Sequence, residues 1–194
     1  MSSKKTGLYL GTFDPFHNGH YFSIVKSFEF VDEVIIQPHN LRPNSKKHTS
    51  LESRLKMCDL GCLDLKKVKV REEKRNVYKH RKDGKFRYQL IKWVEEEIGQ
   101  APIVIMGSDK VTKEMYKDSK SELLEIPHII FLRPGHDELD ILKLKNLFKE
   151  AYFLNPIGDI SSSNIRKLIR KGADVSNFVQ NRVLKYIKEN NLYV

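Results

Sequence analysis

The sequence predicts an α/β protein with a mainly parallel sheet that helices cover on both faces. Short apolar runs alternate with longer helix-like segments, and the first apolar run leads through a glycine-containing turn directly into a helix. Parallel strands need long, usually helical crossovers, so this alternation favours a parallel sheet buried on both faces. A length of 194 residues suits one domain with a sizeable core, and we expect residues 1–194 to form it.

Six segments are expected to be strands because they are short, apolar and bounded by turn residues. These strands are 7–11, 33–38, 67–71, 102–107, 127–132 and 151–154. The expected helices are 18–30, 50–64, 87–98, 110–124 (in one or two pieces), 138–149, 162–171 and 176–190. The last two form a C-terminal helical segment and complete a Rossmann-like prediction. We expect residues 39–49 to be a loop that orders on ligand binding, and 72–86 to be irregular.

The composition is typical of a globular protein outside the membrane. Hydrophobic residues make up 40% of the chain and charged residues 31%. No apolar run approaches the roughly 18 residues of a membrane span, and the N-terminus lacks the apolar stretch of a signal peptide. We therefore expect an intracellular protein, cytoplasmic or, in a eukaryote, nuclear, with no membrane partner.

The net charge of +10 comes from 35 Lys and Arg against 25 Asp and Glu. A basic protein of this size can bind nucleic acid, but it attracts polyanionic small molecules equally well. Much of the basic charge lies between residues 66 and 87, where acidic residues interrupt it and aromatic residues are few. We therefore interpret that stretch as a solvated connection, and nucleic acid is the less favoured partner.

The two cysteines, Cys58 and Cys62, lie four residues apart on an expected helix. Two thiols are too few for a zinc site, and a helix does not favour a disulfide between them. We expect buried free thiols.

The segment 11–20, Gly-Thr-Phe-Asp-Pro-Phe-His-Asn-Gly-His, is the most informative motif. Gly11 lets the backbone approach a ligand closely, and Pro15 places the start of the helix after itself. His17 and His20 are three residues apart and share one face of the first helical turn. A helix N-terminus attracts anions, so the motif predicts phosphate binding. A metal site is less favoured because no further ligand has a natural spacing; two ordinary surface histidines are the other alternative.

A second phosphate site is predicted at residues 161–166, Ser-Ser-Ser-Asn-Ile-Arg. Serines are natural N-caps, and Arg166 falls on the first turn of the helix that they begin. Hydroxyls, free backbone N–H groups and a guanidinium together suit a phosphate. Alone, the pattern would indicate an ordinary capped surface helix; the first motif makes the site the better interpretation.

Both motifs closely resemble signatures of the nucleotidylyltransferase superfamily, and the best match within it is to nicotinate/nicotinamide mononucleotide adenylyltransferases. Residues 11–20 resemble the Gly-x-Phe-Asp-Pro loop with its H-x-G-H pair, and 160–166 resemble the I-S-S-T-x-I-R motif. The segments 107–109 and 133–135, each after an apolar strand, are weaker matches. The resemblance runs in order from residue 7 to residue 193 and so covers nearly the whole chain.

The resemblance implies adenylyl transfer from ATP to nicotinate or nicotinamide mononucleotide, which forms deamido-NAD or NAD and pyrophosphate. The attacking phosphate oxygen is already ionised, so the reaction needs neither a strong base nor a covalent intermediate. The enzyme has to align two phosphates and neutralise charge on the leaving group. Mg²⁺ would enter with ATP and owe little to protein ligands. The implied partners are therefore ATP and a pyridine mononucleotide.

The resemblance also implies a role for each matching residue. His17 and His20 would be the catalytic residues on the ATP phosphates, with His20 nearest the α-phosphate. The ATP-binding residues would also include Gly11, Thr12, Phe13, Gly107, Asp109, Ser162, Ser163 and Arg166. The implied acceptor-binding residues are Lys46, Lys47, Arg87, Tyr116 and Arg133. The family position of Arg133 also suggests a contact near the phosphates; the alternative is a surface cation after a strand.

The acceptor half departs from the family pattern. Bacterial nicotinate-specific members carry P-P-H-K where this chain has Arg-Pro-Asn-Ser-Lys-Lys-His at 42–48, so either lysine could match. The usual Y-T-x-D-T-L segment is replaced by residues 86–90. No tryptophan follows the G-x-D motif, so Tyr116 is the candidate for stacking on the acceptor, whereas Trp93 is expected in the core. The sequence leaves the choice between acid and amide open.

Two other functions stay open. Another adenylyltransferase of the superfamily, such as a phosphopantetheine adenylyltransferase, would use the same ATP half. The helix at 162–171 and the chain length favour the pyridine acceptor, and the R-T-x-G-I-S-T pattern of cytidylyltransferases is absent. A non-catalytic RNA-binding α/β domain could keep the turn, but the intact H-x-G-H pair argues against it. The sequence does not determine the oligomeric state and leaves a homo-oligomer open.

Overall fold

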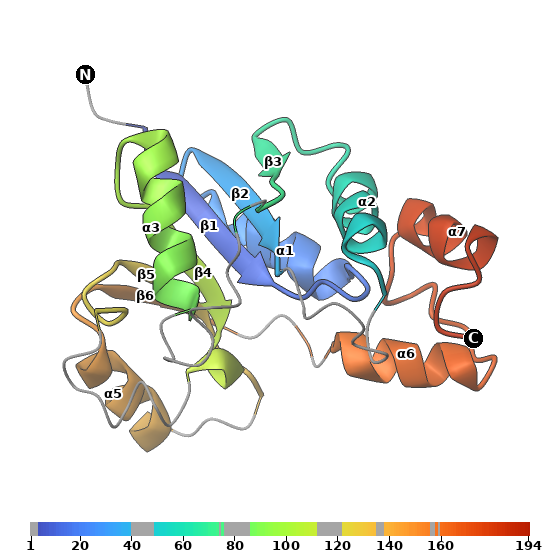
Figure 1. Ribbon diagram of the computed structural model, residues 1–194. Coiled ribbons are helices and arrows are strands. Elements are labelled where there is room, and N and C mark those ends of the chain that lie inside the picture. Colours follow the sequence, from blue (N-terminus) through green and yellow to red (C-terminus); the bar gives the residue numbers. More distant parts are fainter. Residues whose placement is uncertain are drawn as a thin grey trace.

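A six-stranded parallel sheet forms the centre of the protein (Figure 1). The computed structural model describes residues 4–39, 49–73, 75, 86–111, 122–134, 138–155, 158 and 160–194. The strands are β1 (Thr6–Gly11), β2 (Glu33–Pro38), β3 (Val68–Val70), β4 (Ile103–Gly107), β5 (His128–Phe131) and β6 (Ala151–Leu154). Each pair of neighbours is parallel, which confirms the predicted α/β fold.

The strand order β3-β2-β1-β4-β5-β6 places a topological switch point between β1 and β4. The chain builds outward from β1 to β3 and then returns to the other side of β1. In open α/β sheets, ligands bind beyond the carboxyl ends of the strands at such a point. Gly11 ends β1 and Gly107 ends β4, so both glycine-containing motifs meet at this edge.

Helices cover both faces of the sheet (Figure 1). They are α1 (Asn18–Ser27), α2 (Leu51–Gly61), α3 (Phe86–Ile98), α5 (Glu138–Leu147), α6 (Ser162–Arg170) and α7 (Asn181–Glu189), with a 3₁₀ turn, η2 (Ser108–Lys110). Alternate strand residues point to opposite faces. Leu8 and Val104 therefore pack against α3 residues on one face, whereas Ile36 and Ile105 share the larger core with residues of α1, α2, α6 and α7 on the other.

Two of the helix predictions are wrong at the ends that the structure describes. At the ends of the helix expected at 110–124, the 3₁₀ turn at 108–110 runs into an extended Val111, and residues 122–125 form turns ahead of Pro127; residues 112–121 lie outside the described part. The helix expected from 176 begins at Asn181. The Asp174 carboxylate accepts from the Ser176 N–H at 2.9 Å and so holds the chain in a turn there.

The other predicted elements are confirmed to within a few residues at their ends. Cys58 and Cys62 are free and buried, as predicted. Burial raises the pKa of the Cys62 thiol to about 12, so it stays protonated. Over the part of the chain that is described, no helix combines the length and the apolar character needed to cross a bilayer.

Candidate functional site

The end of the loop from β1 to α1 and the first turn of α1 place two stacked histidines at the switch point. His17 is the N-cap of α1, with an extended backbone, and His20 is the third residue of the helix. Their ring centroids lie 3.7 Å apart. The His17 backbone N–H donates to His20 Nδ1 at 3.3 Å. Because this nitrogen accepts, the neutral His20 ring carries its hydrogen on Nε2, where it can donate to a ligand.

Both histidines are uncharged at physiological pH. Burial, reinforced by the positive charge of Arg133, lowers the pKa of His17 to about 3. Burial, followed by the neighbouring His17 and by Arg133, also holds the pKa of His20 well below its ordinary value. The rings can therefore stack without charge repulsion, and an anionic ligand would meet two polar but neutral groups.

Two glycines make room for the aromatic packing around these rings. A Cβ on Gly19 would lie 3.0 Å from the His17 ring, and one on Gly11 would lie 2.8 Å from the Phe13 ring. Phe13 in turn packs edge-on against His20, with centroids 4.9 Å apart. Gly11 is predicted to let a ligand approach the backbone, and its missing side chain also leaves the space in which the Phe13 ring packs.

The start of α6 docks directly on this loop. Ser161 caps the helix by accepting from the Asn164 N–H at 3.2 Å. Ser162 Oγ donates to the Pro15 carbonyl at 3.0 Å, which joins segments 147 residues apart. Arg166 Nη1 donates to the Asp14 carbonyl at 2.5 Å, and its Nη2 donates to Ser163 Oγ at 3.3 Å. The two predicted phosphate-binding motifs therefore form one surface.

A cavity of 290 Å³, here called the histidine cavity, lies between these elements. All ten residues predicted for catalysis or ATP binding line it: Gly11, Thr12, Phe13, His17, His20, Gly107, Asp109, Ser162, Ser163 and Arg166. Asp14 and Lys110 line it as well, and neither was singled out from the sequence. Asp14 could have been found from its place inside the 11–20 motif.

Arg133 also lines the histidine cavity, although the sequence analysis assigned it to the acceptor. It lies just after β5, and its Nε donates to Asp109 Oδ1 at 2.9 Å. Lys110 Nζ lies 2.7 Å from Asp109 Oδ2. Burial opposes the charge on Asp109, but the hydrogen bonds from Lys110 and Arg133 outweigh it and hold the pKa of this carboxyl below its usual value. The site thus holds one carboxylate between two cations.

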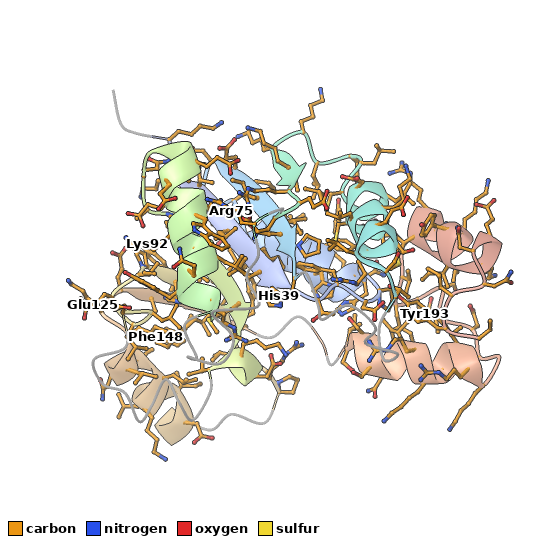
Figure 2. All side chains as sticks on the ribbon, viewed as in Figure 1. His39, Arg75, Lys92, Glu125, Phe148 and Tyr193 are labelled. Carbon is orange, nitrogen blue, oxygen red and sulfur yellow. The ribbon has the colours of Figure 1, made fainter. Side chains whose placement is uncertain are left out.

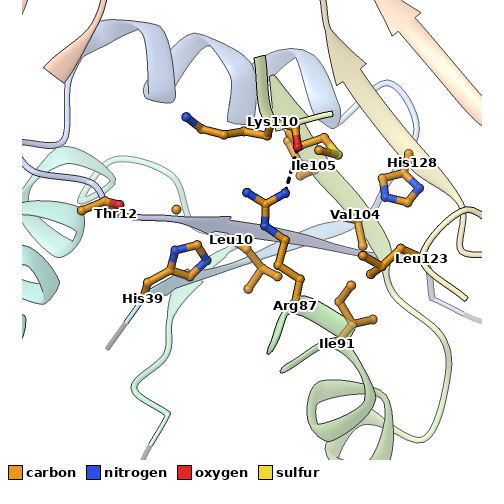
Figure 3. A pocket seen from close by; sticks show the side chains of 12 residues that line it. Leu10, Thr12, His39, Arg87, Ile91, Val104, Ile105, Lys110, Leu123 and His128 are labelled. Carbon is orange, nitrogen blue, oxygen red and sulfur yellow. Dashed lines mark hydrogen bonds between the residues drawn. The ribbon is translucent and has the colours of Figure 1, made fainter. Parts of the chain in front are cut away.

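A second cavity of 190 Å³ lies beside α3 and is here called the α3 cavity (Figure 3). Its walls are largely apolar and come from Leu10, Ile91, Val104, Ile105, Met106 and Leu123. Arg87 reaches into it from the first turn of α3, and its Nη1 donates to the Lys110 carbonyl at 2.9 Å. The two cavities share Gly11 and Thr12, so they meet where β1 ends.

Among the polar residues of the α3 cavity, Thr12 and Arg87 were predicted from the sequence as ligand-binding residues. The residues not predicted are His39, just after β2, Lys110, and His128, the first residue of β5. His128 is 1% exposed, and its Nδ1 lies 2.6 Å from the Ile126 carbonyl. Burial lowers the pKa of His128 to about 4. A histidine opening an otherwise apolar strand was the available signal. Lys46, Lys47 and Tyr116 lie outside the described residues.

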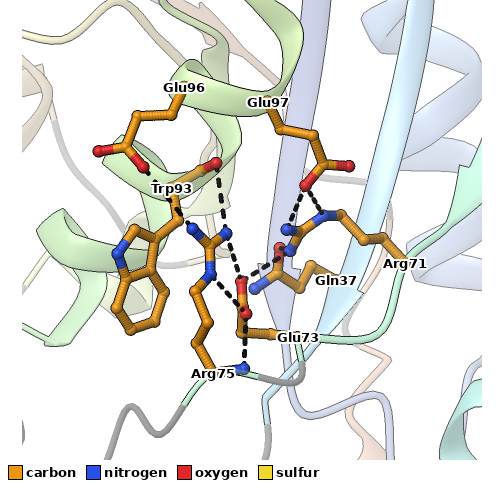
Figure 4. A network of polar contacts seen from close by, with 7 residues as sticks. All are labelled: Gln37, Arg71, Glu73, Arg75, Trp93, Glu96 and Glu97. Carbon is orange, nitrogen blue, oxygen red and sulfur yellow. Dashed lines mark hydrogen bonds and ion pairs between the residues drawn. The ribbon is translucent and has the colours of Figure 1, made fainter.

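An ion-pair network around the buried Glu73 connects α3 to the edge of the sheet (Figure 4). Glu73, 4% exposed, accepts from Arg71 Nη1 and Arg75 Nε, both at 2.9 Å. Arg71 also pairs with Glu97 of α3. The Arg75 guanidinium lies 4.5 Å from the ring centroid of Trp93. The expectation that Trp93 belongs to the core is therefore wrong: its ring is half-buried and provides a face for a cation.

The described residues contain no group of three or more His, Cys, Asp or Glu side chains placed to hold a metal ion.

The family model described as cytidylyltransferase-like matches residues 8–168, which span both motifs and both cavities. The chain belongs to this family. A curated relative from Flavobacterium johnsoniae, named "Probable nicotinate-nucleotide adenylyltransferase", is 31% identical over 196 residues; the match covers 97% of this chain and 98% of the relative. A protein of the same name from Clostridium perfringens strain 13 is 28% identical, with 98% of each chain covered.

Solved structures share the fold of this family member. Nicotinic acid mononucleotide adenylyltransferase from Plasmodium falciparum complexed with APC aligns with a TM-score of 0.74 at 20% identity, over 98% of this chain and 97% of that one. The same enzyme complexed with NaAD aligns with a TM-score of 0.73 at 22% identity over the same shares. At these identities the likeness establishes the Rossmann-like fold.

Proposed function

We propose that this protein is a nicotinate-nucleotide adenylyltransferase, which transfers the adenylyl group of ATP to nicotinate mononucleotide. The observation that carries the proposal is the gathering of all ten predicted catalytic and ATP-binding residues around the histidine cavity, next to a largely apolar second cavity. Full-length relatives with that name support the same acceptor. They favour it over pantetheine phosphate, and a role restricted to RNA binding would leave the paired cavities without a use.

In the proposed reaction, a phosphate oxygen of the mononucleotide attacks the α-phosphorus of ATP. The bond from the α-phosphorus to the bridging oxygen breaks, and pyrophosphate leaves with the electron pair. Because the attacking oxygen is already ionised, the protein's task is to align the two phosphates and to stabilise charge in the transition state. The junction of the two cavities at Thr12 is where the reacting phosphates would meet.

Each part of the histidine cavity has a proposed task. His20 would donate from Nε2 to the α-phosphate, with His17 stacked behind it, and the backbone N–H groups of Thr12 and Phe13 would lie near the same centre. The hydroxyls of Ser162 and Ser163, with Arg166, would bind the β- and γ-phosphates of ATP, which would enter as its Mg²⁺ complex. Gly107 and Asp109 would hold the ATP ribose, and Arg133 would release part of its pairing with Asp109 to contact phosphate.

The α3 cavity would take the acceptor. Its apolar walls suit the flat pyridine ring, and Arg87, which reaches into the cavity, would attract the carboxylate or the phosphate of nicotinate mononucleotide. Lys46, Lys47 and Tyr116 stay proposed acceptor residues on the family resemblance alone. We also propose a cytoplasmic location, where ATP and pyridine mononucleotides are available.

The test is a set of parallel assays with ATP and Mg²⁺, offering nicotinate mononucleotide, nicotinamide mononucleotide or pantetheine phosphate. We expect dinucleotide and pyrophosphate in equal amounts with nicotinate mononucleotide, and a lower kcat/KM with the amide. The His20→Ala variant, purified in the same way, controls for contaminating enzymes. If product forms only with pantetheine phosphate, then pantetheine phosphate is the acceptor and the proposed pyridine acceptor is wrong. If product forms with none of the three compounds, the proposed function is refuted.

A further inference from the structure

A fully buried carboxylate, Asp14, lies in the middle of the loop that carries the histidines. The Tyr193 hydroxyl donates to its Oδ1 at 2.5 Å, across 179 residues of chain. Thr49 donates to the same carboxylate twice, from Oγ1 to Oδ1 at 2.7 Å and from its backbone N–H to Oδ2 at 3.3 Å. Figure 2 shows Tyr193 between α6 and α7, on the side of the molecule where α6 meets the loop. A buried charge needs such donors, because burial without them is very unfavourable.

The backbone of the same residue is bound by the arginine proposed to hold ATP. Arg166 Nη1 donates to the Asp14 carbonyl at 2.5 Å, so the guanidinium and the Tyr193 hydroxyl meet at one residue from two directions. Arg54, 1% exposed, completes the support by donating from Nη1 to the Thr12 carbonyl at 3.0 Å. Arg54 of α2, Arg166 of α6 and the C-terminal Tyr193 therefore all donate hydrogen bonds to this loop.

Tyr193 is fixed in this position. Its φ of 70° lies in the left-handed region, which a non-glycine residue adopts at an energetic cost. Its ring packs at the edge of the larger core, beside Met57, whose Sδ lies 3.8 Å from the hydroxyl. Burial and then the charge of Asp14 raise the pKa of Tyr193 above its usual range, so the hydroxyl keeps the proton that it donates.

We propose that Tyr193 is a positioning residue for ATP binding. Its hydroxyl stabilises the charge of Asp14, so that Arg166, bound at the Asp14 carbonyl and at Ser163 Oγ, keeps its remaining N–H groups directed at the β- and γ-phosphates. Without that hydroxyl, the under-compensated carboxylate would compete with phosphate for Arg166. The inference rests on the proposed function for the identity of the ligand, but the geometry of Asp14 does not depend on it.

The experiment compares Tyr193→Phe with Tyr186→Phe as a matched control. Tyr186, on α7, is also partly buried beside the same core, but its hydroxyl donates at 3.5 Å to Ser53 Oγ on α2 and not to Asp14. We expect Tyr193→Phe to raise the KM for ATP by about ten-fold, as for a lost hydrogen bond to a charged group. The KM for the pyridine mononucleotide should stay within about two-fold, and Tyr186→Phe should change neither constant.

Calorimetric binding of a non-hydrolysable ATP analogue, without acceptor, gives a second readout that needs no turnover. The proposal is supported if Tyr193→Phe binds the analogue more weakly and Tyr186→Phe does not. This outcome does not require the wild-type protein to form dinucleotide, so a failure of this proposal is distinguishable from a failure of the proposed function. An unchanged KM and an unchanged analogue affinity would overturn it. A parallel rise of both KM values with a fall in Tm would also overturn it, because a merely structural hydroxyl would act in that way. If Tyr193→Phe does not fold, the same measurements are made on Thr49→Val, which removes the other hydroxyl that donates to Asp14. The same outcomes then support or overturn the proposal.

Discussion

The two cavities of the site are adjacent but are built in different ways. The histidine cavity is shaped mainly by the loop after β1 and the first turn of α6, which bind each other through hydroxyl and guanidinium contacts to main-chain carbonyls. The α3 cavity is lined by apolar side chains from several elements, and its helix is anchored by ion pairs at a distance from the cavity itself. One half is thus defined by polar groups close together in two short motifs, and the other by packing.

This difference explains why substitutions should act differently in the two halves. A change in the histidine cavity removes a group that would touch ATP, with little effect on the core. A change in the network around Glu73 removes nothing from the α3 cavity, but it allows α3, which carries Arg87 and Ile91, to move. The first kind of change should alter catalysis at nearly constant stability, and the second should alter stability together with acceptor binding.

The largest expected effect is that of His20→Ala. The variant loses the Nε2 donor proposed for the α-phosphate, and we expect kcat to fall by about a thousand-fold, as for loss of a preorganised transition-state donor. Steady-state pyrophosphate release measures kcat, and circular dichroism with Tm verifies that the fold is intact. A folded variant with near-normal kcat would contradict the role given to His20.

The next effect is that of Arg166→Ala, which tests whether α6 contributes to ATP binding. Loss of a charged hydrogen-bond donor should raise the KM for ATP by about 10- to 100-fold and change the acceptor KM little. Lys167→Ala is the matched control, because Lys167 is the next residue of the same helix and is exposed. Equal KM values for ATP in the two variants would contradict the proposed contribution of α6 to ATP binding.

The effect of Glu73→Gln should fall on the other half of the site. The neutral amide leaves two arginines without their shared carboxylate, so we expect a loss of about 2–3 kcal/mol in the free energy of unfolding. The acceptor KM should rise several-fold, with the ATP KM unchanged. Urea unfolding and steady-state kinetics measure the two parts. Glu95→Gln, which breaks only the partly exposed pair with Lys92, should cost less than about 1 kcal/mol.

Acid should lower the free energy of unfolding of the wild-type protein, partly through protonation of Glu73. Burial opposes its charge, but hydrogen bonds from Arg75 and Arg71 outweigh burial and hold the pKa of this carboxyl below its ordinary value. Its contribution is therefore complete above the unfolded pKa and is lost as the pH falls through the folded pKa. Glu73→Gln should have a shallower loss of stability below pH 4.5 than wild type, and parallel curves would contradict this account.

The smallest expected effect is a pH dependence from His17. Its pKa is about 3 in the folded protein against the ordinary 6.5, so the unfolded chain binds the proton more tightly, and the free energy of unfolding decreases as the pH falls below 6.5. Between pH 7 and pH 5, His17 should account for a loss of about 2 kcal/mol in the free energy of unfolding. Urea unfolding at both pH values measures it. The difference should shrink in His17→Gln, and an unchanged difference would show that His17 is not held neutral by burial.

The sequence could predict the histidine cavity because its parts are encoded over short distances. A glycine-containing turn, two histidines at i, i+3 and a serine-capped helix with an arginine on its first turn each have a physical meaning on their own. The same holds for the six strands, whose apolar runs and turn residues fix their positions to within a few residues. Long helices with clear apolar spacing were predicted for the same reason.

The predictions failed where side-chain contacts outside the apolar pattern decide the outcome. Trp93 looks like a core residue from its neighbours in α3, but Arg75, held by Glu73, covers its ring. The helix expected from 176 starts later, because the turn after Asp174 precedes it. The parallel pairing of β5 with β4 also brings Arg133, predicted among the acceptor residues, to Asp109 in the histidine cavity, and its role stays a prediction.

By itself, the sequence determined the α/β fold, the positions of the strands and the residues of the two phosphate motifs, because local periodicity and capping chemistry depend on neighbours in the chain. Only the tertiary structure decided that α6 docks on the loop after β1, that Arg87 faces an apolar cavity with His128 in its wall, and that Tyr193 reaches Asp14. These contacts join residues up to 179 positions apart, and the folded sheet brings together groups that no local pattern connects.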